Sequence, residues 1–494
     1  MSTLKNLAGQ TAIYGLSTIV ARLLNYLLVT LYTYNFTTGE YGLVTEMYSY
    51  TSFLMVIVTY GMETAFFRFS VSEPERDKVY STALISLLLS TILFWALSIG
   101  FSGQIAGVIR HPDRIQDLIY VLLIIGLDAF TSIPFAKLRE QNRASRFAFI
   151  KIINIAVNIA LNLFFIGLCK NAYEQPDSTF HDLALKVYNP KIGVGYVFLS
   201  NLISNLVVLI FLAPEVVKAK FRFDYILWKK MMVYALPLLL AGLAGMTNET
   251  MDRLLLKYLL PAGTAENQVG IYGACYKISI ILTIFIQTFR YAAEPFFFNH
   301  AKEKNPQKLY ADVMKYFCVA CAFIALGTMV NLSWIQYMVG KPFRSGLAVV
   351  KILLVANFCL GVFYNLSIWY KLTNQTRFGA YLTGLGAVIT LVLNFWLIPI
   401  IGYLGSAYAT LVCYAIMMVV SYILGNKHYP VEYNLTQIFG YLILSLVLYL
   451  ISKWLLQGPG LIKLALNNLL VISYLLIVFG FEKSRLKQYS GKWK

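Results

Sequence analysis

The sequence predicts an all-α polytopic membrane protein with about 14 transmembrane helices. Of its 494 residues, 59% are hydrophobic and only 13% are charged, whereas soluble proteins average about 25% charged residues. The apolar residues form long continuous runs, and a bilayer core takes roughly 20 such residues per helix. These observations exclude a cytosolic enzyme, a secreted disulfide scaffold and a disordered protein.

Fourteen runs are long enough to span a bilayer, and none shows the short alternating segments of a β-barrel strand. The first run is too long for a signal peptide and lacks a small-residue cleavage site, so we expect it to be the first span. The predicted spans are residues 11–34, 42–67, 80–100, 117–136, 147–168, 192–213, 230–250, 270–297, 312–332, 347–370, 379–399, 404–424, 437–456 and 461–480.

The positive charges predict how the chain is oriented. The net charge is +18, but the charges lie mainly in loops between apolar runs, so we expect no nucleic-acid partner. If the N-terminus is cytoplasmic, 25 of the 41 Lys and Arg residues fall in inside segments and 11 in outside segments. Because inside loops carry the excess of Lys and Arg, both termini are predicted to be cytoplasmic.

Short matches predict an internal repeat. Tyr41-Gly42-Leu43 before span 2 corresponds to Val269-Gly270-Ile271 before span 8, each with a Tyr six positions after its Gly. Asn162-Leu163-Phe164 and Asn394-Phe395-Trp396 correspond at nearly the same offset. Spans 1–6 and 7–12 therefore read as two copies of a six-helix unit. Both copies start on the same side of the membrane, which predicts parallel repeats related by an axis along the membrane normal.

The repeat predicts two six-helix bundles around a central cleft, followed by two C-terminal helices. The predicted divisions are 1–225 for the first bundle, 226–430 for the second, and 431–494 for the last two spans and a cytoplasmic tail. Two parallel bundles that rock about a cleft form the architecture of an alternating-access transporter.

Ionisable residues within spans are costly and usually face a cavity or a partner. Five predicted cations lie on spans 1, 7, 8 and 10, and we expect them to line the cleft: Arg22, Arg253, Lys277, Arg290 and Lys351. A basic, water-filled cleft suits an anion, above all a pyrophosphate, because Arg pairs bidentately with phosphate oxygens. Alternatively, Arg253 and Lys351 lie near the outer interface, where long side chains reach water easily.

Three carboxylates accompany these cations: Asp128, Asp252 and Glu294. Glu294 lies four residues after Arg290, so the two side chains could neutralise each other on one helix face. Asp252 lies beside Arg253, near the outer end of its span. Asp128 lies in the middle of span 4, where it could pair with Arg22 or act as a coupling site for Na⁺ or H⁺.

Other chemistry is not indicated. The six Cys residues are scattered or lie within apolar spans, so disulfides are not expected. The four His residues are far apart in the sequence, and no metal site or other cofactor is predicted. No Walker-type phosphate loop occurs, so we do not expect ATP hydrolysis.

Three stretches resemble the polysaccharide transporter branch of the multidrug/oligosaccharidyl-lipid/polysaccharide (MOP) exporter superfamily, the Wzx-type flippases. They are Thr38-Gly39-Glu40-Tyr41-Gly42, then Met251-Asp252-Arg253-Leu254 with Val269-Gly270-Ile271-Tyr272, and Gly402-Tyr403-Leu404-Gly405-Ser406-Ala407. With the predicted topology, the resemblance covers the whole chain. It implies a flippase, not an enzyme, that moves an undecaprenyl-pyrophosphate-linked oligosaccharide to the outer leaflet of a bacterial plasma membrane for cell-surface polysaccharide synthesis.

The resemblance also implies partners and alternatives. The partners are a lipid-linked oligosaccharide, membrane lipids and, as candidates, other polysaccharide-assembly proteins, with the last two spans forming a groove for the polyprenyl tail. A lipid II flippase is the alternative within the superfamily, and a small-molecule exporter fits less well. A membrane polysaccharide polymerase usually has a large outer loop, whereas the longest outer loop here is 169–191. A scramblase without coupling is the third class.

Overall fold

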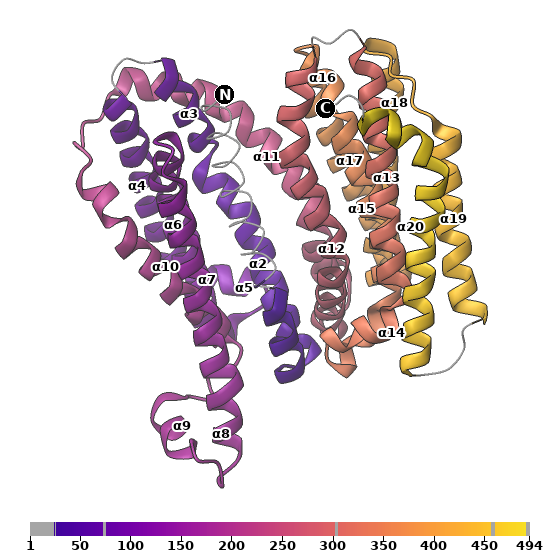
Figure 1. The fold of residues 1–494 in the computed structure, drawn as a ribbon. Helices are drawn as coiled ribbons and strands as arrows, with labels where there is room; N and C mark the ends of the chain where they lie inside the picture. The colour runs from indigo at the N-terminus through magenta and orange to yellow at the C-terminus, as the bar shows by residue number, and fades with distance from the viewer. Residues whose placement is uncertain (1–23, 25, 73–75, 302–304, 456–459, 491–494) are drawn as a thin grey trace. The chain divides into compact units, whose positions relative to one another are not determined.

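The computed structural model describes residues 24, 26–72, 76–301, 305–455 and 460–490, and nearly all of them are helical (Figure 1). Thirteen described helical segments are long and apolar enough to cross a membrane, so the chain is a multi-pass membrane protein. Most of the predicted span 11–34 lies outside the described residues. The other 13 predicted spans each correspond to one of these segments.

The chain forms two compact units. Unit 1 comprises residues 1–274 together with 390–406, and unit 2 comprises residues 275–389 together with 407–494. The long helix α12 (Ala262–His300) begins in unit 1 and continues into unit 2, and α17 (Arg377–Ile401) and α18 (Tyr403–His428) contribute to both. The division of the sequence into two repeats of six spans remains a prediction, since compactness and repeat ancestry are separate properties.

Unit 1 is a bundle in which α6 packs against α2, α4 and α10. Its elements are α2 (Thr38–Thr59), α3 (Met62–Ser72), α4 (Arg76–Gly100), α5 (Ser102–Val108), η1 (Pro112–Arg114), α6 (Ile115–Glu140), α7 (Ala144–Asn162), a π-helical turn η2 (Leu163–Cys169), α8 (Lys170–Glu174), α9 (His181–Val187), α10 (Gly195–Val217) and α11 (Tyr225–Leu259).

The predicted span 42–67 is built from two helices rather than one. Backbone φ angles of 36° at Tyr60 and 74° at Gly61 end α2 and separate it from α3. The left-handed conformation cannot continue an α-helix. α3 packs against α4 and α11 around buried Met62 and Phe66, and α2 contacts the same two helices. The break therefore separates two helices that pack against a shared set of neighbours.

Helix α11 begins at a well-defined cap. The Asp224 carboxylate accepts a hydrogen bond from the Leu227 backbone N–H at 2.9 Å and pairs with the Lys78 ammonium at 2.6 Å. The hydrogen bond from Lys78 lowers the pKa of Asp224, and the Leu227 amide lowers it further. An Asp at this position stabilises the first turn of α11.

Unit 2 contains the later spans and the last two helices. Its elements are the end of α12, α13 (Pro306–Val330), α14 (Leu332–Ile335), η3 (Gln336–Met338), η4 (Lys341–Gly346), α15 (Leu347–Leu366), α16 (Ile368–Leu372), most of α17 and α18, α19 (Leu435–Leu455) and α20 (Leu461–Ser490).

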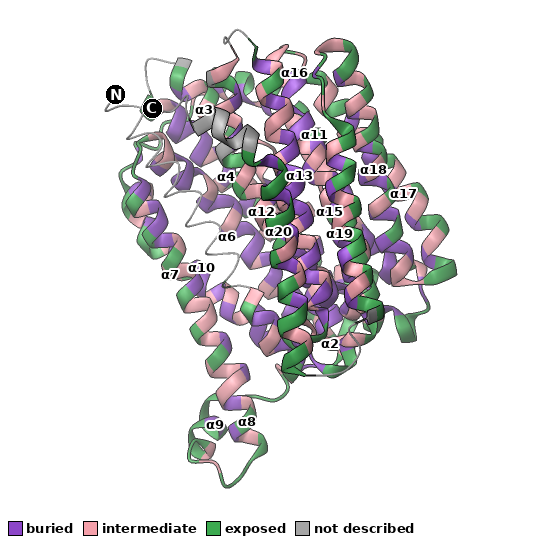
Figure 2. Cartoon of the chain, turned by 45° about the vertical axis from the view of Figure 1, so that its right-hand side comes forward, coloured by how far each residue is buried: buried purple, intermediate pink, exposed green. Residues whose placement is uncertain are grey.

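A buried ion pair ties α20 to α13. The Lys315 ammonium lies 2.6 Å from the Glu482 carboxylate, and both side chains are 2% exposed. Tyr316 and Tyr441 donate their hydroxyls to the same carboxylate. By contrast, Figure 2 shows exposed positions along α19 and α20, and many of these are apolar, including Phe439. Exposed apolar faces on spanning helices suit contact with lipid.

Candidate functional site

Helices α2 and α12 approach closely where glycines remove the side chains between them. A Cβ atom at Gly270 would overlap the carbonyl oxygen of Thr38 and lie 2.9 Å from the backbone nitrogen of Gly42. A Cβ at Gly273 would lie 2.5 Å from the Thr45 hydroxyl. Small residues permit such contact between spanning helices. We call this contact the glycine crossing, and it joins the two glycines that mark the predicted repeat.

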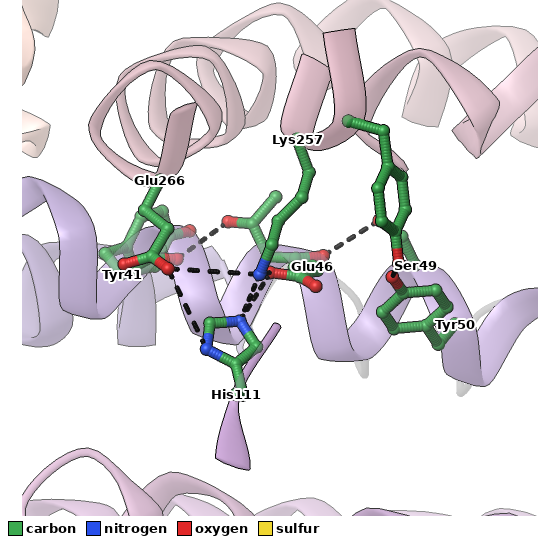
Figure 3. A network of polar contacts seen from close by, with 9 residues as sticks. Tyr41, Glu46, Ser49, Tyr50, His111, Lys257 and Glu266 are labelled. Carbon is green, nitrogen blue, oxygen red and sulfur yellow. Dashed lines mark hydrogen bonds and ion pairs between the residues drawn. The ribbon is translucent and has the colours of Figure 1, made fainter. Parts of the chain in front are cut away.

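Four charged or titratable side chains lie close together (Figure 3), and we call them the charge cluster. One of them belongs to Glu266, whose backbone lies against Gly42 of the glycine crossing. Lys257 Nζ lies 2.8 Å from Glu46 Oε2, and His111 Nε2 lies 2.9 Å from the same oxygen. Lys257 Nζ also contacts His111 Nε2 directly. Glu266 Oε1 lies 3.8 Å from His111 Nδ1 and 3.9 Å from Lys257 Nζ.

The charge cluster is assembled from four separate parts of unit 1. Glu46 lies on α2, Lys257 near the end of α11, and Glu266 in the early turns of α12, while His111 directly precedes η1. Side chains of Glu46, Lys257 and His111 are only 1%, 3% and 8% exposed. Burial of a charge is costly unless it is paired and hydrogen-bonded, so their pairing stabilises this arrangement of α2 against α11.

Neighbouring contacts hold the same helices together. The hydroxyls of Tyr50 on α2 and Tyr258 on α11 lie 2.5 Å apart, and Thr38 donates to Asn267 Oδ1 at 2.6 Å. The Arg110 guanidinium lies 5.2 Å from the centre of the Tyr258 ring, within the range of a cation–π interaction. In the predicted orientation, this end of the helices faces the outside of the cell.

A second cluster lies in unit 2. Arg290 Nε lies 2.9 Å from Glu294 Oε1, and the Lys371 ammonium lies 2.6 Å from the same oxygen. The Arg290 guanidinium also lies 4.9 Å from the centre of the Tyr364 ring. All four residues line one pocket. The pair Arg290–Glu294 forms as its spacing predicts, but Lys371 adds a positive charge, so the cluster as a whole is cationic.

Two other predicted residues also pair with each other. The Asp252 carboxylate accepts hydrogen bonds from the Tyr272 hydroxyl, at 2.5 Å, and from the Arg253 backbone N–H. The Arg253 guanidinium donates to the Glu249 carbonyl at 2.6 Å and lies 3.5 Å from Asp252. Both side chains are buried. The contacts named here join residues of α11 and the start of α12.

The remaining predicted residues lie apart from these clusters. Lys277 is exposed on α12, and Lys351 is exposed on α15, with its ammonium 5.9 Å from the Tyr449 ring centre. Asp128 on α6 interacts electrostatically with Lys151 on α7. Arg22, the expected partner of Asp128, lies outside the described residues. A common cavity for all five predicted cations remains a prediction.

Sequence reasoning missed Glu46, His111, Lys257, Glu266, Lys151 and Lys371. Lys257 and His111 lie between predicted spans, where a charged or titratable side chain gives no sign of burial. Glu46 did offer a signal, because a carboxylate within a predicted span needs a partner. Its partners Lys257 and His111 are 211 and 65 residues away, however, and single-sequence spacing rules reach only neighbours on one helix.

Comparisons with known proteins address both fold and family. Residues 7–300 match the family described as "Polysaccharide biosynthesis protein", whereas no curated protein sequence matches the chain. A solved structure of "Lipid II flippase MurJ, inward closed conformation" is similar with a TM-score of 0.76 at 12% identity, over 96% of this chain and 99% of that chain.

Multidrug transporters of the MATE family share the fold as well. An inward-facing structure of a MATE transporter of the MOP superfamily has a TM-score of 0.65 at 13% identity, over 83% of this chain and 97% of that chain. An outward-facing structure has a TM-score of 0.59 at 13% identity, over 85% and 94% of the two chains. The fold is therefore that of MurJ and the MATE transporters.

Proposed function

Since the chain belongs to the family of polysaccharide biosynthesis proteins and has the fold of MOP flippases and transporters, we propose that it moves an undecaprenyl-pyrophosphate-linked oligosaccharide across the bacterial inner membrane. In this proposal both termini are cytoplasmic, transport proceeds by alternating access, and the cargo serves cell-surface polysaccharide synthesis. The membrane potential, negative inside, favours outward movement of an anion by about 2.3 kcal/mol per charge per 100 mV.

The observation that carries this proposal is the cationic cluster of Arg290, Glu294 and Lys371 in its pocket. Two cations share one carboxylate, so an anion gains a net attraction there. Arg290 presents a planar guanidinium that can donate two parallel hydrogen bonds to a phosphate group. The exposed apolar faces of α19 and α20 offer a surface for a polyprenyl chain. A pyrophosphate joined to a long lipid satisfies both features.

A lipid II flippase is the second candidate, and the fold similarity to MurJ favours it. Lipid II also carries a pyrophosphate on a polyprenyl chain, so the cationic pocket suits both cargoes. The two candidates differ in the sugar, which makes the accumulating lipid the decisive observation. A membrane polymerase would instead join sugar units when purified with lipid-linked substrate.

The test is mass spectrometry of polyprenyl-linked lipids in cells depleted of the protein and complemented with variants. We expect a lipid-linked oligosaccharide to accumulate on depletion and with Arg290→Ala, because the mutant pocket loses its bidentate donor. Arg377→Ala is the matched control, since this exposed cation at the start of α17 is not among the residues that line the pocket. Accumulation of lipid II with cell lysis would select the second candidate, and absence of any lipid-linked intermediate would reject both.

A further inference from the structure

The charge cluster contains more contacts than a simple ion pair between Lys257 and Glu46. Two nitrogen atoms, Lys257 Nζ and His111 Nε2, approach the single oxygen Glu46 Oε2 and also contact each other. The other oxygen, Glu46 Oε1, is buried and accepts no hydrogen bond from the residues that the structure describes. Among these residues, two nitrogens therefore approach one carboxylate oxygen and none donates to the other.

The two contacts of His111 Nε2 require different protonation states. The Lys257 ammonium has only donor hydrogens, so its contact with Nε2 requires a lone pair there, whereas a hydrogen bond to Glu46 Oε2 requires a proton on Nε2. When Nε2 has the lone pair, the proton of the neutral ring is on Nδ1, on the side of Glu266 Oε1. With a neutral imidazole, the two carboxylates and one ammonium give the charge cluster a net charge of −1. One added proton would neutralise the cluster.

We infer that the charge cluster is a proton-binding site that controls the contact between α2 and α11. The proton adds to Nε2 of His111, which then donates to Glu46 Oε2, 2.9 Å away. The imidazolium repels the adjacent Lys257 ammonium, which turns toward Glu266 Oε1, 3.9 Å away. Glu46 thereby exchanges a partner on α11 for a partner on the segment before η1, and α11 loses its ion pair with α2.

A proton suits this site better than a sodium ion. The Lys257 ammonium already lies where a cation would sit beside Glu46, and a second bound cation would be repelled. Histidine is the side chain that ordinarily changes charge between pH 5 and 8. The other ionisable groups around the site are Tyr50 on α2, Arg110 and Arg114 near η1, Asp117 on α6 and Tyr258 on α11. The two tyrosines are neutral between pH 5 and 8, and the two arginines with an ionised Asp117 add one positive charge to the surroundings.

The predicted orientation places the charge cluster at the outer end of the helices. Protonation from the outside, where the proton concentration is higher, would therefore weaken the contact between α2 and α11, and release of the proton to the inside would restore this contact. This inference adds a coupling ion, the proton, to the proposed function. The role of the site in transport rests on that proposed function. Proton binding itself can be tested without any cargo.

The test uses spin labels on the purified full chain in lipid nanodiscs, at exposed Gln104 on α5 and exposed Thr264 on α12. Pulsed electron paramagnetic resonance then measures the distance between them at pH 8 and pH 5. We expect the population with the longer distance to grow as pH falls, by at most about tenfold per pH unit, the limit for one linked proton. Added sodium at constant pH should change nothing.

Variants distinguish protonation of His111 from other effects of low pH on the protein. His111→Gln should keep the short distance at both pH values, whereas His181→Gln on α9 should respond like the wild type. Lys257→Met removes the bond between α2 and α11, so it should show the longer distance already at pH 8. An unchanged distance in the wild-type protein, or a pH response that persists in His111→Gln, would overturn the inference.

The outcome is independent of cargo recognition. Arg290→Ala should retain the full pH response of the spin-label distance, because its pocket lies in unit 2 and its partners are Glu294 and Lys371. A retained response together with failed lipid accumulation would reject the proposed function and keep the proton site. The converse result would reject the proton site alone.

Discussion

Replacing Gly270 by Ala tests the glycine crossing directly. The added Cβ would overlap the Thr38 carbonyl oxygen and lie 2.9 Å from the Gly42 nitrogen, whereas ordinary contacts are 3.4–4 Å. Both obstructing atoms belong to the backbone, so the clash can be relieved only by moving one helix, by half an ångström or more. Forced overpacking of this kind typically costs about 1–3 kcal/mol.

This cost applies only while α2 and α12 are in contact. The clash is absent in an open state, in which α2 and α12 are separated. The ratio of closed to open molecules should therefore fall roughly 5- to 150-fold, the factor equivalent to about 1–3 kcal/mol. The higher helix propensity of Ala, about 1 kcal/mol, cancels from this ratio because α12 is helical in both states. It does not cancel from global unfolding, which is therefore the poorer assay.

The assay is the rate at which a Thr45→Cys reporter reacts with a maleimide at fixed pH. Thr45 faces Gly273 across the crossing, and all six native Cys residues are buried. Gly263→Ala is the matched control, because this glycine of α12 has nothing within 4 Å of its would-be Cβ. We expect faster labelling with Gly270→Ala than with Gly263→Ala. Equal rates for the two variants would refute the reasoning.

Three further predictions follow from single contacts. Lys315→Met should destabilise the protein by about 3–5 kcal/mol because it strands the buried Glu482 carboxylate; thermal unfolding should show this loss and its partial recovery on adding Glu482→Gln. Gly402→Ala should lower the unfolding temperature, since its φ of +60° disfavours a side chain, and an unchanged temperature would contradict this. The lowered pKa of Asp224 stabilises the fold above the ordinary Asp range, and that stability is lost as pH falls through the lowered pKa. Asp224→Asn keeps the cap but not the charge, so its unfolding temperature should depend less on pH than that of the wild type between pH 6 and 3.

The membrane fold could be predicted from sequence because the bilayer imposes a simple length and composition rule on each span. That rule locates helices but not their breaks, which is why the left-handed residues Tyr60 and Gly61 inside one predicted span went unrecognised. Hydropathy describes the polarity of side chains and carries no information on backbone dihedral angles, so it could not reveal this break. Span ends also extended beyond prediction, as in Ala144–Glu174, where polar residues continue the helix past its apolar run.

The candidate site was only partly predictable. The contact between Arg290 and Glu294 was one of two alternatives that the sequence offered, because residues four apart share a helix face. Lys371 and Lys257 join their clusters from positions 77 and 211 residues away along the chain, and only tertiary packing brings them there. Gly42 and Gly270 mark the predicted repeat, but nothing in a single sequence indicates that the two glycines contact each other.

The glycine crossing bears on how such a chain could have arisen. Gly42 and Gly270 occupy equivalent places in the two predicted repeats, and they meet at one contact. If the repeats arose by duplication, the contact joins two copies of one ancestral position. In a homodimer of a single six-helix ancestor, that glycine would have touched its own copy across the two-fold axis, as in any isologous interface. After fusion of the two genes, the residues at positions 42 and 270 could mutate independently, provided that the facing helix leaves space for the new side chain. Among relatives, we expect residues at these two positions to vary together, with bulk gained at one offset by its absence at the other.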